Sequence, residues 1–107
     1  MANQLRAFPT PLLKIPMPII KITRDHRKPL PDAKSAIESL AKDIAERFAI
    51  DYEWDGYTLH FQRIGVSGQI GITTTRVQVH VDISFFMIPI KSAIEDEIRV
   101  HLEREFS

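Results

Sequence analysis

The 107-residue sequence has no cysteine, which excludes disulfide bonds, a thiolate nucleophile and a zinc site with sulfur ligands. It also has no excess charge, because 14 lysine and arginine residues balance 14 aspartate and glutamate residues. Without a strong positive field, the chain is a poor candidate for binding nucleic acid or an anionic membrane. Apolar runs such as Phe85 to Ile90 are far shorter than the roughly 20 residues of a transmembrane helix. With no signal-peptide pattern either, we expect a cytoplasmic protein without a membrane span.

Apolar residues make up 44% of the chain and charged residues 26%, which is typical of globular proteins. A chain of this length forms one domain around one hydrophobic core. Prolines cluster between residues 9 and 18, and each removes a backbone hydrogen-bond donor. The pattern predicts an extended, poorly ordered arm over residues 1–16 and a single domain over residues 17–107.

Two stretches have the periodicity of amphipathic helices. The first begins at Pro31 and should end near Ala49, with a buried stripe of Ala33, Ala36, Ile37, Leu40, Ala41, Ile44, Ala45 and Phe48. The second follows Pro89, and its apolar residues recur every four positions at Ile90, Ile94, Ile98, Leu102 and Phe106.

Alternating apolar and polar residues predict a first strand at Pro18 to Thr23 and two hairpins. Asp55-Gly56 favours a two-residue turn, in which Trp54 would pair with Tyr57. The second hairpin joins residues 69–73 to residues 76–85. Threonine resists the positive φ of a two-residue loop, so we expect a longer loop over residues 73–75.

The predicted order is β-α-β-β-β-β-α. Strands that alternate in this way have one apolar face to cover. We therefore expect an α+β fold, a two-layer sandwich in which both helices pack on one face of a mainly antiparallel sheet.

Histidine is the residue type that would most readily bind metal or transfer protons. His60, His80 and Asp82 fall on the polar sheet face, where a cluster is conceivable but a solvated surface is the ordinary interpretation. We interpret His101 as a polar-face residue near the C-terminal end of its helix, where a cation would be favoured.

Ser67 lies in Gly65-Val66-Ser67-Gly68, which lacks the spacing of a nucleophile turn and fits a strand-connecting turn. Adjacent Asp96 and Glu97 point in different directions on a helix and are interpreted as surface charge. The sequence thus predicts no catalytic residue, no metal and no cofactor.

Alternation fails over Phe85, Phe86, Met87, Ile88 and Ile90, which we call the apolar lip. One interpretation is a corner where the strand leaves the sheet and tucks between the two helices. The other is an exposed lip that seats on a partner or a hydrophobic surface, since contiguous exposed apolar residues mark interaction sites.

Taken together, several short motifs resemble the small polyhydroxyalkanoic acid system proteins, which bacteria encode with polyhydroxyalkanoate granule genes. The matching positions are His26, Tyr52-x-Trp54-x-Gly56, Leu59-x-Phe61, Gly65-Val66-Ser67-Gly68 and Ile94-Glu95-x-Glu97-Ile98. The resemblance implies a granule-associated or regulatory protein of storage-polyester metabolism. It implies neither catalytic residues nor a cofactor.

Three hypotheses follow for the function. The leading one is a non-enzymatic protein that binds polyhydroxyalkanoate granules, or granule proteins, through the apolar lip. The second is a self-assembling module that forms a two-fold homodimer through its polar sheet face or an edge strand. The third is a pocket for an apolar or hydroxyacyl ligand, lined by Tyr52, Trp54, Tyr57 and Phe61.

Overall fold

The structure, a computed structural model, describes residues 19–106, so the arm predicted over residues 1–16 lies outside the described residues. The elements follow the predicted order. They are β1 (Ile19–Asp25), α3 (Leu30–Phe48), β2 (Asp51–Asp55), β3 (Thr58–Arg63), β4 (Val66–Ile72), β5 (Arg76–Ile83), the short 3-10 helix η1 (Phe85–Met87) and α4 (Ile88–Phe106).

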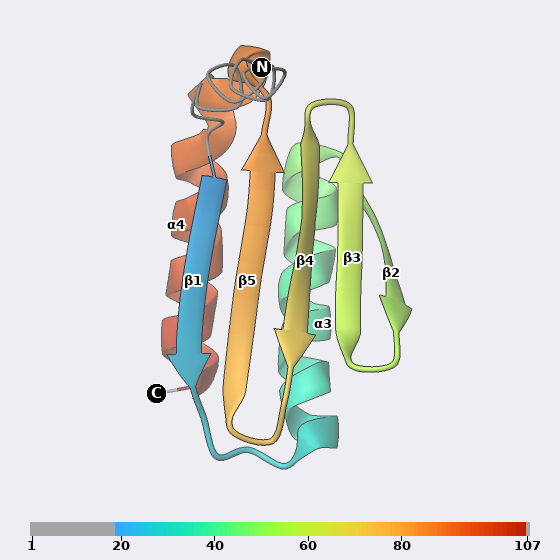
Figure 1. Ribbon diagram of the computed structural model, residues 1–107, viewed down its shortest axis with the longest axis vertical. Coiled ribbons are helices and arrows are strands. Elements are labelled where there is room, and N and C mark those ends of the chain that lie inside the picture. The colour runs from blue at the N-terminus through green and yellow to red at the C-terminus, as the bar shows by residue number, and fades with distance from the viewer. Residues whose placement is uncertain (1–18, 107) are drawn as a thin grey trace, which may run out of the picture.

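The five strands form one antiparallel sheet in the order β1-β5-β4-β3-β2. Both long helices lie on the same side of this sheet, α4 behind β1 and β5 and α3 behind β4 and β3 (Figure 1). The predicted two-layer α+β sandwich is confirmed. An ion pair between Arg47 of α3 and Glu97 of α4 ties the helices together.

The inner face of the sheet and the facing helix stripes form one apolar core, because each strand turns alternate side chains toward the helices. The opposite face has no helix over it in the described part of the chain. We call this surface the open sheet face. It comprises Ile19, Lys21, Thr23, Asp51, Glu53, Asp55, Thr58, His60, Gln62, Ser67, Gln69, Gly71, Gln78, His80 and Asp82.

Helix α3 begins one residue before the predicted start and ends one residue before Ala49. Pro31 lies in its first turn, where no intrahelical donor is required, and Asp32 lies near the positive end of the helix dipole. Ala49 adopts the left-handed conformation, with φ of 56°, and its backbone N–H donates to the carbonyl of Ala45. This residue ends the helix and directs the chain into β2.

The register predicted for the first hairpin is wrong. Trp54 pairs with Leu59, and Asp55 pairs with Thr58. The two turn residues are therefore Gly56 and Tyr57, with Gly56 at the first central position and a φ of +63°. Glycine at that position is the requirement of a type II′ turn. The shift is an even number of residues, so Trp54 keeps its predicted face.

The second hairpin differs from the prediction at its start. Strand β4 begins at Val66, so Ser67 lies within a strand, not in a connecting turn. The turn before it is Ile64-Gly65, and Gly65 has a φ of +87°. The loop between β4 and β5 spans residues 73–75, as predicted, and is longer than two residues.

Candidate functional site

The apolar lip lies where β5 leaves the sheet, and most of it is exposed. Phe85, Phe86 and Ile88 are 57%, 66% and 44% exposed, whereas Met87 and Ile90 are half-buried and pack against the core. Strand β5 ends at Ile83, two residues earlier than predicted, and α4 begins at Ile88. The lip is therefore a surface, not a segment tucked between the helices.

The change from strand to helix explains why alternation fails here. The Ser84 backbone N–H donates to the Gly65 carbonyl and the Met87 N–H to the Ser84 carbonyl, which closes the single turn of η1. In a helical turn, side chains advance by about 100° per residue. Met87 and Ile90 consequently point inward while their neighbours point outward.

A fourth exposed apolar residue, Ile64, belongs to the same surface although it comes from the turn between β3 and β4. It is 81% exposed and precedes Gly65. A Cβ atom at Gly65 would lie 2.5 Å from Met87 Cγ and 3.0 Å from two ring carbons of Phe86. These side chains therefore pack on the turn itself. We call Ile64, Phe85, Phe86 and Ile88 the apolar patch.

The aromatic side chains of β2 are held by one carboxylate of α3. Tyr52 Oη donates to Glu38 Oε2 and Trp54 Nε1 donates to Glu38 Oε1, each at 2.8 Å. The Trp54 hydrogen bond, assisted by the one from Tyr52, lowers the pKa of Glu38. The hydrogen bond to Glu38 in turn raises the pKa of Tyr52. The Lys34 ammonium lies 4.8 Å from the Trp54 ring centroid. This network pins the edge strand to the helix.

The four residues predicted to line a ligand pocket do not share one environment. Phe61 is buried in the core, Tyr52 and Trp54 are half-buried with their polar atoms on Glu38, and Tyr57 is exposed. The space between α3 and the sheet beside Tyr52 and Phe61 is too small for a water molecule. A ligand between these elements would have to displace existing contacts. The ligand pocket lined by Tyr52, Trp54, Tyr57 and Phe61 stays a prediction.

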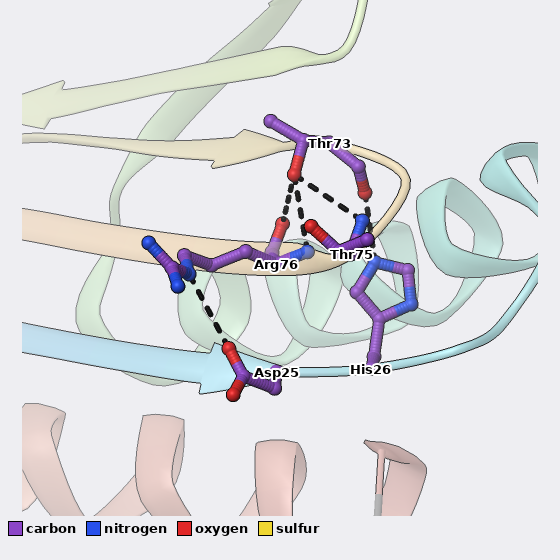
Figure 2. Close-up of polar contacts among 5 residues, drawn as sticks. All are labelled: Asp25, His26, Thr73, Thr75 and Arg76. Carbon is purple, nitrogen blue, oxygen red and sulfur yellow. Dashed lines mark hydrogen bonds and ion pairs between the residues drawn. The ribbon is translucent and has the colours of Figure 1, made fainter.

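His26 fastens the end of the sandwich that carries the β4–β5 loop (Figure 2). Its backbone N–H donates to Thr75 O at 2.9 Å, and its Nε2 lies 2.8 Å from Thr73 O. The Lys28 N–H donates to its Nδ1, so the bonds fit the neutral tautomer that carries its proton on Nε2. The ring also meets Phe106 edge to face at 5.2 Å. The family motif residue His26 thus has a structural role here.

The polar-surface interpretation of His101 is wrong, because this residue is only 2% exposed. Its Nε2 lies 3.1 Å from the Ala36 carbonyl of α3, and Arg104 Nη2 lies 3.2 Å from its Nδ1. His101 therefore joins the two helices. His101 follows the buried Ile98 by three residues, but only the packing of α4 on α3 shows that its ring is enclosed.

Of the three residues of the conceivable cluster on the open sheet face, only His80 and Asp82 lie within hydrogen-bond distance of each other. His80 Nε2 lies 3.3 Å from Asp82 Oδ1, whereas His60 is separated from His80 by the intervening strand β4. Within residues 19–106, no three histidine or acidic side chains are grouped so that they could hold a metal ion. No helix in this part of the chain is long and apolar enough to cross a membrane.

Residues 20–106 match the family described as "Putative polyhydroxyalkanoic acid system protein". The chain belongs to this family. No curated protein and no solved structure gives a match. For this polyhydroxyalkanoic acid system protein, the predicted resemblance is confirmed over nearly all of the described residues.

Sequence reasoning missed two contributors to these sites. Ile64 joins the apolar patch only because the β3–β4 turn folds against η1, a contact between distant segments. The alternation in β3 ends at Arg63. An isolated apolar residue, Ile64, between Arg63 and Gly65 was the available sign of an exposed apolar side chain. Glu38 lies outside the predicted apolar stripe of its helix, and nothing in the local sequence connects it to Tyr52 or Trp54.

Proposed function

We propose that this chain binds the surface of polyhydroxyalkanoate granules through the apolar patch and catalyses no reaction. The observation that carries the proposal is the exposure of four large apolar side chains at one end of the sandwich, drawn from two separate segments. Contiguous exposed apolar residues usually mark an interaction site. Membership of the polyhydroxyalkanoic acid system family supports the choice of the polyester as this surface.

The patch suits an uncharged surface. Near it, Arg63 donates to the Phe48 carbonyl at 2.7 Å, and Lys91 pairs with Glu95 at 3.2 Å. These cations are engaged within the fold, so they do little to attract anionic lipid headgroups. A polyester surface offers aliphatic chain and ester groups without charge, which matches an apolar patch whose neighbouring cations are already engaged.

The expected affinity is moderate. Full burial of a large apolar side chain contributes about 1.5–3 kcal/mol, and association costs about 4–15 kcal/mol in lost freedom of motion and in ordering. Four partly exposed side chains therefore give reversible binding by a single molecule. The protein should exchange between granule and solution.

The test is co-sedimentation with isolated granules, measured for wild type and a Phe86→Asp, Ile88→Asp double variant whose fold is checked by circular dichroism. A matched control, Thr74→Asp with Val100→Asp, adds the same two charges at exposed positions outside the patch. Wild type and the control should pellet with granules, and the patch variant should stay in solution. Wild type that remains in the supernatant, or a patch variant that pellets equally, would contradict the proposal.

A second arm separates the polymer from its protein coat. Granules stripped by protease and washed should retain wild-type binding, because the patch contacts the polyester. Binding that disappears with the coat would show that a granule protein is the partner instead.

A further inference from the structure

The open sheet face has a self-complementary arrangement of side chains. Its central row, read from one edge of the sheet to the other, is Lys21, His80, Gln69, His60 and Glu53. Gln69 lies on β4, the central strand, with two strands on either side. Neighbouring strands are about 4.8 Å apart, so Lys21 and Glu53 each lie about 10 Å from Gln69, on opposite sides of it.

Neither Lys21 nor Glu53 forms an ion pair within the described residues, and both are exposed. The nearest row neighbours are His80 for Lys21 and His60 for Glu53. Each charge is therefore available to a partner that approaches the open sheet face.

Two sheets whose strands stay aligned can meet face to face about a two-fold axis in either of two directions. An axis across the strands through the central row would place Lys21 over Lys21 and Glu53 over Glu53 of the second copy, so like charges would oppose each other. An axis parallel to β4 exchanges β1 with β2 and β5 with β3. Lys21 then lies over Glu53, and Gln69 meets its own copy.

We infer that two copies of this chain associate through their open sheet faces, about a two-fold axis running along β4. The two Lys21–Glu53 pairs join the opposite edges of the sheets. His80 meets His60, and a neutral imidazole can donate to a second one because it carries one donor and one acceptor. The Gln69 amides bond to each other at the centre.

The two flanking rows contain three acids, Asp51, Asp55 and Asp82, and no cation. Asp51 of β2 meets Ile19 of the second copy, and Asp55 meets Thr23, so neither acid faces another acid. Asp82 meets Gln62, an uncharged donor. The axis therefore brings no like charges into opposition in any of the three rows.

The size of the surface indicates a weak, reversible dimer. Three rows of five positions contribute fifteen residues from each copy. Stable complexes use about 20–30 residues a side, and this surface is largely polar. The dimer should dissociate on dilution.

The direction of the axis matters for granule binding. Rotation about β4 leaves each copy pointing the same way along the strands, so both apolar patches lie at the same end of the dimer. This consequence rests on the proposed function: a dimer would present two patches to one surface. Linked sites raise overall binding without any new contact, because the second attachment is intramolecular.

The test is sedimentation velocity over a wide concentration series, without granules. Wild type should pass reversibly from monomer to dimer. Lys21→Glu and Glu53→Lys should each weaken the dimer by at least about tenfold, because each creates two like-charge contacts. The Lys21→Glu, Glu53→Lys double variant should recover wild-type dimerisation. Glu46→Lys, an equal change of charge on the exposed side of α3, should leave it unchanged.

Three results would overturn the inference: a wild type that stays monomeric at all concentrations, single reversals that dimerise normally, or a double reversal that fails to recover. The Phe86→Asp, Ile88→Asp variant should dimerise as wild type does, and loss of its dimer would move the interface to the apolar patch. Because these measurements contain no granules, their failure leaves the proposed function standing.

Discussion

The two ends of the sandwich differ in how far their side chains are used for contacts within the fold. At the end with the β4–β5 loop, which we call the sealed end, His26 occupies the backbone groups of Thr73 and Thr75 and covers Phe106. At the other end, the apolar patch leaves Ile64, Phe85, Phe86 and Ile88 exposed. At the first end, polar and aromatic contacts are made within the fold, whereas at the second end large apolar side chains have no such contacts to cover them. The difference separates residues that hold the fold from residues available for binding.

Among the substitutions that compare the two ends, Gly65→Ala should have the largest effect, because Met87 and Phe86 pack against this glycine. A side chain there meets a φ of +87° and a Cβ contact of 2.5 Å with Met87. Strain and overpacking together should cost about 3 kcal/mol of unfolding free energy, measured by urea denaturation. Gly71→Ala is the matched control, because a Cβ there meets nothing within 4 Å. Equal effects of the two substitutions would contradict the packing described at Gly65.

At the sealed end, His26→Ala should lower the unfolding free energy by about 2 kcal/mol. The substitution leaves the Thr73 carbonyl and the Lys28 N–H without their partner and opens space beside Phe106. His80→Ala on the open sheet face is the control and should change stability by less than about 0.5 kcal/mol. If both histidine variants are equally stable, His26 does not seal this end.

The edge strand β2 lies between the two ends, and its contact with Glu38 makes part of the stability depend on pH. Because the pKa of Glu38 is lowered in the folded state, its contribution to stability is present above the ordinary carboxyl pKa and is lost as pH falls through the folded value. Glu38→Gln should cost about 1 kcal/mol near neutral pH and much less in acid, where Glu38 of wild type is itself protonated. Unfolding followed by Trp54 fluorescence against pH measures this, and a penalty that grows in acid would contradict the assignment.

The smallest effect on stability should come from the apolar patch itself. Phe86→Ala and Ile88→Ala remove exposed side chains, so each should change the unfolding free energy by less than about 0.5 kcal/mol. Ile94→Ala, a fully buried residue of the same helix, should instead cost about 2–5 kcal/mol. Thermal unfolding of the three variants makes the comparison. A large loss at Phe86 or Ile88 would mean that these side chains serve the core.

Much of the fold was predictable because periodicity is local. The stripe from Ala33 to Ile44 and the alternation from Val77 to Ile83 each report their own element, and one-sided strands require both helices on one face. The predicted register of the first hairpin was wrong because Asp55-Gly56 indicates a turn but does not show which central position the glycine takes.

The candidate site was predictable only in part. The broken alternation at Phe85 to Ile90 located the lip, yet its exposure depends on where η1 turns and on Gly65, which is 20 residues earlier in the chain than Phe85. His101 and Glu38 were misplaced or missed for the same reason. Their partners, Ala36 for one and Trp54 for the other, lie on different elements.

The most direct measurement is granule co-sedimentation of Phe86→Ala, Ile88→Ala beside His26→Ala, at a temperature where both are folded. The account predicts that the patch variant keeps wild-type stability and loses granule binding, while the His26 variant loses stability and keeps granule binding. If the patch variant still binds like wild type, or the His26 variant loses binding while folded, the assignment of binding to the apolar patch is contradicted.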